Sequence, residues 1–88
     1  MCRNIRTLFN YQPPATGEEI HASALQFVRK LSGYTQPSKV NEAAFRRAVE
    51  EVSAAANRLL ASLETMSPPR DREIEAQKAR ERAKARYG

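Results

Sequence analysis

Apolar residues recur at helical spacing in two stretches of the chain. The first stretch is bounded by clear stop signals: Thr16 and Glu19 form the Thr-x-x-Glu pattern of a capping box, and Gly33 suits a left-handed C-cap. The apolar positions between them are Ile20, Ala24, Phe27, Val28 and Leu31. This spacing predicts a helix over residues 17–32.

The second apolar pattern is longer and follows a short loop at residues 34–38. Its members are Phe45, Ala48, Val49, Val52, Ala56, Leu59 and Leu63. They fall within about a third of the helix circumference, which predicts a core-facing helix over about residues 40–64, capped by Ser38 or Asn41. Because the loop is short, we expect the two helices to pack antiparallel as a hairpin over residues 17–64.

The N-terminal segment is expected to close one end of this hairpin. Asn4 can cap a single helical turn in which Ile5, Leu8 and Phe9 share one face. The rest of the predicted core comprises Ile20, Ala24, Phe27, Val28, Leu31, Phe45, Val49, Val52, Leu59 and Leu63.

A charged segment follows the chain break at Pro68 and Pro69. Helix formers dominate from Asp71 to about Arg86, with acids early and bases late, as the helix dipole favours. The apolar positions form a narrow seam of Ala76, Ala79, Ala83 and Tyr87, with Ile74 to one side. An isolated helix of this length is marginal in water, so we expect the seam to dock on the hairpin or on a partner. The pattern as a whole predicts an all-α fold in a single domain, residues 1–88: a short N-terminal helix or turn, the antiparallel hairpin, and a basic terminal helix over residues 70–88.

The net charge of +5 is concentrated at the two ends of the chain. Residues 1–16 carry two bases and no acid, residues 17–67 carry six of each, and residues 68–88 carry seven bases and four acids. Basic ends of this kind meet an anionic partner or aid solubility. No apolar run approaches the ~20 residues that span a bilayer, and no secretory signal is present, so we expect a soluble cytoplasmic protein without membrane contact.

The residue types that catalysis and metal binding need are sparse. The single histidine, His21, lies at the edge of an apolar stripe and is interpreted as a surface residue. The three glycines are scattered and form no phosphate-binding loop. Soft metal sites need several cysteines or histidines together. We therefore expect no enzymatic activity, no metal and no cofactor.

Cys2 is the one candidate reactive group. Removal of Met1 would leave it at the chain start beside Arg3, whose charge lowers the pKa of a neighbouring thiol. Cys2 is therefore either a redox or modification site or an ordinary terminal residue.

Two kinds of binding remain open. Basic residues of the last helix form two ridges that could contact phosphates, with Arg3 and Arg6 joining them if the two ends of the chain lie close. The ridges are Lys78, Arg82 and Arg86, and Arg80 and Lys84. Glu75 and Glu81 interrupt them, so the alternative is a solvated face. Our first expectation is a non-enzymatic binding or adaptor module that contacts a protein or a second copy of itself through the alanine seam. Salt-dependent nucleic-acid binding comes second.

Several segments of the sequence resemble a small bacterial family known only as a domain of unknown function, family 2277. The segments are Met1-Cys2-Arg3-Asn4-Ile5, Pro13-Pro14-Ala15-Thr16, Gln26-Phe27-Val28-Arg29-Lys30, Ser32-Gly33 and Pro68-Pro69-Arg70-Asp71-Arg72-Glu73. The resemblance covers nearly the whole chain. It implies a short, stand-alone bacterial protein and brings no assigned activity.

A second likeness covers residues 16–63, which look like the helical hairpin of J-domain co-chaperones. The segments that carry it are Thr16-Gly17-Glu18-Glu19-Ile20 and Asn41-Glu42-Ala43-Ala44-Phe45. J-domains signal through His-Pro-Asp in the loop, and here the loop reads Tyr34-Thr35-Gln36-Pro37-Ser38. This likeness implies an antiparallel hairpin and an adaptor role at most, without stimulation of a chaperone ATPase.

Overall fold

Helices make up most of the chain. The computed structural model describes residues 4–87. In order, its elements are β1 (Tyr11–Gln12), α1 (Gly17–Ser32), the short 3-10 helix η1 (Lys39–Asn41), α2 (Glu42–Ser62), β2 (Arg70–Asp71) and α3 (Arg72–Tyr87). The expectation of a mostly helical chain is confirmed, and the predicted bounds of the first helix agree with α1. The all-α description is broadly consistent with this structure, to which two strands of two residues each add a small parallel sheet.

Local signals set both ends of α1. The Thr16 hydroxyl accepts a hydrogen bond from the Glu19 N–H at 3.2 Å, and the Glu19 carboxylate accepts one from the Thr16 N–H at 3.0 Å. At the other end Gly33 has φ 81° and its N–H donates to the Arg29 carbonyl at 2.9 Å. Glycine reaches this left-handed conformation without steric cost, so the helix ends where the sequence indicates.

The start of α2 differs from the sequence prediction. Neither Ser38 nor Asn41 caps the helix with its side chain. Asn41 is already helical (φ −103°, ψ −2°), so its side-chain oxygen is not placed to accept from the first turn. Its amide instead donates to the Ser38 hydroxyl at 2.9 Å, and η1 leads into α2 through the backbone.

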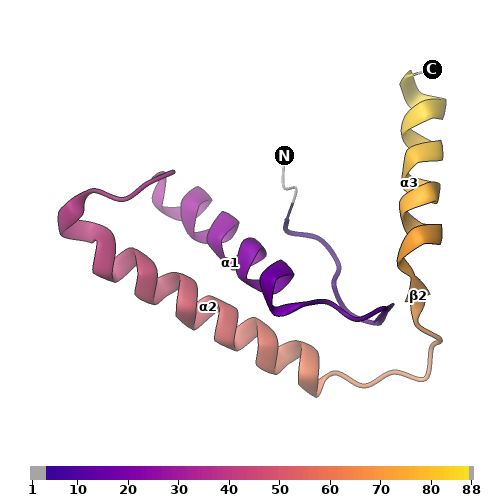
Figure 1. The fold of residues 1–88 in the computed structure, drawn as a ribbon, viewed down its shortest axis with the longest axis horizontal. Helices are drawn as coiled ribbons and strands as arrows, with labels where there is room; N and C mark the ends of the chain where they lie inside the picture. Colours follow the sequence, from indigo (N-terminus) through magenta and orange to yellow (C-terminus); the bar gives the residue numbers. More distant parts are fainter. Residues whose placement is uncertain (1–3, 88) are drawn as a thin grey trace.

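The core lies between α1 and α2, which run antiparallel side by side (Figure 1). Among the residues whose burial the structure describes, four apolar ones are buried: Ile20, Ala24, Val28 and Val49. Phe45 and Val52 are half-buried against this cluster. All six belong to the predicted core.

Four other predicted core residues, namely Phe27, Leu31, Leu59 and Leu63, are exposed. The physical reason is that α1 and α2 pack only against each other along their apolar stripes within the described residues, and one helix covers only part of a wide stripe. On α1 this leaves Leu31 75% exposed. Near the end of α2, Ala56 and Leu60 are half-buried in place of Leu59 and Leu63.

The N-terminal segment contains no helix within residues 4–10, so the predicted helical turn capped by Asn4 is wrong. Its backbone hydrogen-bonds to α1 instead. The Gln26 side chain accepts from the N–H groups of Asn4 and Ile5 at 2.8 and 3.2 Å, and the Ser23 hydroxyl donates to the Asn4 carbonyl. Of the three residues expected to share one face, Leu8 and Phe9 are half-buried and Ile5 is exposed.

A two-residue parallel bridge joins the N-terminal segment to the chain before α3. Tyr11 pairs with Arg70 and Gln12 with Asp71. Asn10 precedes the bridge with φ 63°, a conformation that asparagine tolerates better than most residues. Its carbonyl accepts from the Arg70 N–H at 2.8 Å, and its amide donates to the Pro68 carbonyl at 3.2 Å. The bridge therefore fixes the point from which α3 starts.

α3 stands away from the α1–α2 pair (Figure 1). The Asp71 carboxylate caps it by accepting from the Ile74 N–H at 3.0 Å. Arg72 and Glu75 are half-buried, whereas residues 76–85 are all exposed. The alanine seam is thus not docked on the helix pair.

Candidate functional site

The first turn of α3 is anchored by one carboxylate, that of Glu19 on α1. Arg72 forms a two-pronged ion pair with it, with nitrogen–oxygen distances of 2.7 and 3.0 Å. The Arg72 Nε–H also donates to the Pro13 carbonyl at 2.6 Å. Because the guanidinium is planar and the pairing bidentate, this contact fixes direction as well as position.

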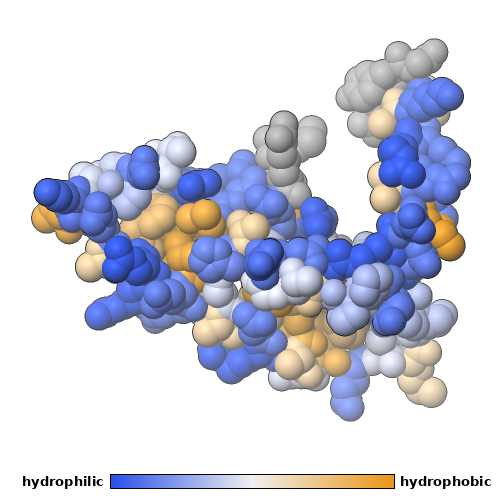
Figure 2. All heavy atoms as spheres, viewed as in Figure 1, coloured by the Kyte–Doolittle hydropathy of each residue, from blue (hydrophilic) through white to orange (hydrophobic). Residues whose placement is uncertain are grey.

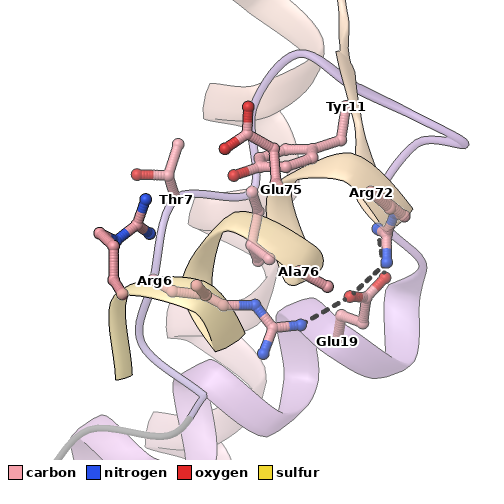
Figure 3. Close-up of a pocket in the computed structure, with 10 residues that line it drawn as sticks. Arg6, Thr7, Tyr11, Glu19, Arg72, Glu75 and Ala76 are labelled. Carbon is pink, nitrogen blue, oxygen red and sulfur yellow. Dashed lines mark hydrogen bonds and ion pairs between the residues drawn. The ribbon is translucent and has the colours of Figure 1, made fainter. Parts of the chain in front are cut away.

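A second guanidinium reaches Glu19 from the N-terminal segment. Arg6 Nη2 lies 3.0 Å from Glu19 Oε2, so the carboxylate joins three parts of the chain: residues 4–12, α1 and α3 (Figure 3). The Glu19 side chain is only 20% exposed. Partial removal from water strengthens such charge-assisted hydrogen bonds.

These contacts shift the protonation equilibria. The hydrogen bonds from Arg72, followed by that from the Thr16 N–H, lower the pKa of Glu19 to about 2. The same carboxylate raises the pKa of Arg72. Glu19 is therefore ionised throughout the physiological pH range.

Tyr11 adds a ring to this cluster. The guanidinium carbons of Arg70 and Arg72 lie 5.5 and 6.0 Å from the centre of the Tyr11 ring. Both distances fall within the range of cation–π attraction. Tyr11 therefore contributes to holding β1 against β2 and the start of α3.

An open cleft of about 660 Å³ separates α3 from the N-terminal segment. It is lined by Arg6, Thr7, Leu8, Tyr11, Glu19, Arg72, Glu75, Ala76, Ala79 and Arg82. Two of the alanines of the seam thus face this space. The Glu75 carboxylate is held loosely by Lys78, with 3.8 Å between nitrogen and oxygen.

The structure brings together only part of the predicted basic site. Arg6 and Arg82 line the same cleft, so one cation of the N-terminal segment and one of α3 border a common space. Lys78, Arg80 and Lys84 are exposed on α3, and Arg86 belongs to the same helix. Helical spacing places Arg80 and Lys84 on the opposite side of α3 from Lys78 and Arg82. Arg3 and Cys2 lie outside the described residues.

Sequence reasoning missed the roles of Tyr11 and Arg72 in this site. Glu19 was found only as half of a capping box. Arg72 binds it from 53 positions further along the chain, so no local pattern connects the two. The family resemblance included Arg72 within the Pro-Pro-Arg-Asp-Arg-Glu segment, and this was the one signal that singled out the region.

A second exposed surface lies between α1 and α2 near their connecting loop. There the structure has an apolar groove of about 410 Å³, lined mainly by Phe27, Val28, Leu31, Tyr34, Ala44, Phe45, Ala48 and Val52. Figure 2 shows the apolar side chains gathered at this end of the helix pair. Phe27 and Leu31, two of the four predicted core residues on α1 and α2 that are exposed, belong to this groove.

Residues 4–87 contain neither a candidate metal site nor a membrane-spanning helix. No three histidine, cysteine or acidic side chains gather there in a way that could hold a metal ion. None of the helices in this range is long and apolar enough to cross a membrane. His21 is exposed.

Comparison with known proteins gives a family without an assigned activity. No curated protein and no solved structure matches the chain. A family model described as "Uncharacterized conserved protein (DUF2277)" matches residues 1–78, a range that includes Glu19, Tyr11, Arg72 and the first seven residues of α3. Because the match covers most of the chain, this protein belongs to that uncharacterized family, DUF2277.

Proposed function

We propose that this chain is a non-enzymatic protein-binding module whose binding element is α3. The observation that carries the proposal is the isolation of this helix. Residues 76–85 are all exposed, although they continue a helix of 16 residues. A helix of this length without packing is marginal in water, so a partner that covers its seam would stabilise it.

The contacts that anchor the first turn of α3 favour a role in binding over the alternative that residues 72–87 form a disordered tail. Arg72 is oriented by Glu19 and by the Pro13 carbonyl, and the bridge at Tyr11–Gln12 fixes the chain just before it. A helix that is held at its first turn is presented to a partner in a defined direction. Such preorganisation lowers the entropy lost on binding.

The surface chemistry supports a protein as the partner. Within residues 76–85 the exposed part of the seam consists of Ala76, Ala79 and Ala83, and such small side chains allow another helix to approach closely. The apolar groove between α1 and α2 is a further surface of the kind found at protein interfaces, since monomeric proteins rarely leave large apolar patches uncovered.

A matched pair of substitutions tests the seam. Ala79 lies on the seam, whereas Ala85 lies on the opposite side of α3, and each has a glutamate four residues before it. The full chain is immobilised and used to capture proteins from extract of the source cells, with and without nuclease. We expect specific capture that is insensitive to nuclease, is lost with Ala79→Glu and is retained with Ala85→Glu. Capture that survives Ala79→Glu, or that nuclease abolishes, contradicts the proposal.

Nucleic-acid binding is the second candidate function. The observation in its favour is that Arg6 and Arg82, from the two basic segments of the chain, line one cleft. The division of the other cations between two sides of α3 weakens it. Fluorescence anisotropy with labelled RNA tests this alternative: it requires binding that falls steeply with salt and weakens with Arg82→Ala. Binding absent at 50 mM salt would exclude it.

A further inference from the structure

Charges of opposite sign flank the alanine seam of α3 in a symmetric order. Helical spacing places Glu75 and Arg82 along one side of the seam, and Glu73 and Lys84 along the other. Within these two pairs the acid precedes Ala79 and the base follows it; Lys78 also lies on the side of Arg82, and Arg80 lies on the side of Lys84. Glu75 lies four residues before Ala79 and Arg82 three residues after it, while Glu73 and Lys84 lie six before and five after.

This order is self-complementary when the helix is reversed end for end. In an antiparallel pair centred on Ala79, Glu75 of each copy lies beside Arg82 of the other copy. On the second side, Glu73 lies beside Lys84 in the same way. Ala76 then meets Ala83 across the pair, and small side chains let the two backbones approach closely. A parallel pair would place the two acidic starts together and the two basic ends together, against the attraction of both charges and helix dipoles.

We propose that α3 pairs antiparallel with α3 of a second copy of this chain, which forms a two-fold symmetric dimer. The inference rests on the proposed function and names its partner. Such an interface is isologous, so one seam and one set of charges serve both copies.

This face of α3 borders the open cleft whose other wall is the N-terminal segment of the same chain. Ala76, Ala79 and Arg82 line the open cleft, and Lys84 is exposed. The nearest competing contact of Glu75 is its loose pair with Lys78 at 3.8 Å. Because α3 is about 24 Å long and carries small apolar side chains, the interface is smaller than a standard one, and we expect a Kd of about 10–100 µM.

Reciprocal charge reversal tests the register. Sedimentation velocity of the full chain is measured from about 5 µM to 1 mM, with a reductant present because Cys2 can otherwise link two copies. We expect reversible dimers for the unmodified chain. Glu75→Arg alone and Arg82→Glu alone each place like charges side by side in the dimer, so each variant should dimerise at least tenfold more weakly. An equimolar mixture of these two variants restores both attractions and should form heterodimers close to the original affinity.

Further variants keep the inference separate from the proposed function. Ala79→Glu should be monomeric and Ala85→Glu dimeric, with equal helix content by circular dichroism. Dimers that persist in both charge variants, or a mixture that stays monomeric, overturn the pairing. If the chain is monomeric at 1 mM while Ala79→Glu still abolishes capture of another protein, self-pairing is wrong and the proposed function stands. If only copies of this chain are ever captured through the seam, the pairing stands and the search for another partner protein ends.

Discussion

Glu19 is the residue on which the arrangement of the segments depends. Its carboxylate accepts hydrogen bonds from the Thr16 N–H and from the guanidinium groups of Arg6 and Arg72. The first contact belongs to the local cap of α1, and the other two join distant parts of the chain. One side chain therefore serves helix formation and tertiary structure together.

We expect Glu19→Gln to lower the free energy of unfolding at pH 7 by about 1–2 kcal/mol, because the neutral amide forms weaker hydrogen bonds with two cations. The pKa of Glu19 in the folded protein, about 2, lies below its ordinary value of 4.5. The stabilisation is therefore fully present above about pH 5 and is lost as the pH falls toward 2. Urea unfolding at pH 7 and near pH 2 should show the difference between the two proteins shrinking at low pH.

Glu18→Gln is the matched control for this measurement. Glu18 is the neighbouring acidic residue in the same turn of α1, it is exposed, and its carboxylate makes no hydrogen bond or ion pair within residues 4–87. Its replacement should change the free energy of unfolding by no more than about 0.5 kcal/mol. An equal effect of the two substitutions would mean that Glu19 acts only through the helix dipole.

Burial separates two apolar residues that the sequence pattern treats alike. Val49 is 4% exposed in the core, whereas Leu31 is 75% exposed. We expect Val49→Ala to cost about 1–3 kcal/mol and Leu31→Ala less than about 0.5 kcal/mol, although leucine loses more carbon atoms. The midpoint of urea unfolding of each variant measures its loss of stability, provided that the m-value stays the same. A larger loss for Leu31→Ala would show that the groove beside it is closed in solution.

At the scale of elements, local signals predicted what depends on neighbours in sequence. The capping box and Gly33 set the bounds of α1 because their partners lie three or four residues away. The N-terminal segment was predicted wrongly because its backbone bonds to Gln26, 22 and 21 positions from Asn4 and Ile5. The weak tendency of Asn4 to cap a helical turn does not outweigh these hydrogen bonds. The local sequence pattern contains no signal that predicts them. The same holds for Arg72 and the cleft that it helps to form.

The width of an apolar stripe is a second limit of sequence reasoning. Periodicity identified the faces of α1 and α2 that carry apolar residues, and it identified all four buried ones. It could not show that each face would meet only one neighbouring helix. With a third packed helix, Phe27 and Leu31 would be core residues, and without one they line a groove.

The orientation of α3 should depend on the bidentate ion pair between the Arg72 guanidinium and the Glu19 carboxylate. We expect Arg72→Ala to free the helix, since it removes both bonds to Glu19 and the bond to Pro13. Arg72→Lys should give an intermediate result, because it keeps the charge without the two-pronged geometry. Residual dipolar couplings of backbone amides in α3 relative to those in α1 measure this: the couplings of α3 should average toward zero in the alanine variant. Arg80→Ala, at an exposed site on the same helix, should leave the couplings unchanged.

For the molecule as a whole, the core and α3 should unfold separately. Among residues 4–85 the buried residues all lie on α1 and α2, and within α3 only Arg72 and Glu75, both in its first turn, are half-buried. No shared apolar packing therefore makes loss of α3 depend on loss of the core. Hydrogen exchange should show amides of residues 76–85 opening with a small free energy in dilute protein, while amides around Val49 open only with global unfolding.

Protein concentration then distinguishes the two units. If α3 pairs between copies, mass action stabilises it as concentration rises above the dissociation constant, whereas the α1–α2 core gains only indirectly. We expect protection of residues 76–85 to increase several-fold between about 10 µM and 1 mM, with little change near Val49. The same comparison on Ala79→Glu should show no dependence on concentration. Protection of α3 that is already high in dilute protein would mean that the helix is held within one copy, and the separate unfolding of the two units would be wrong.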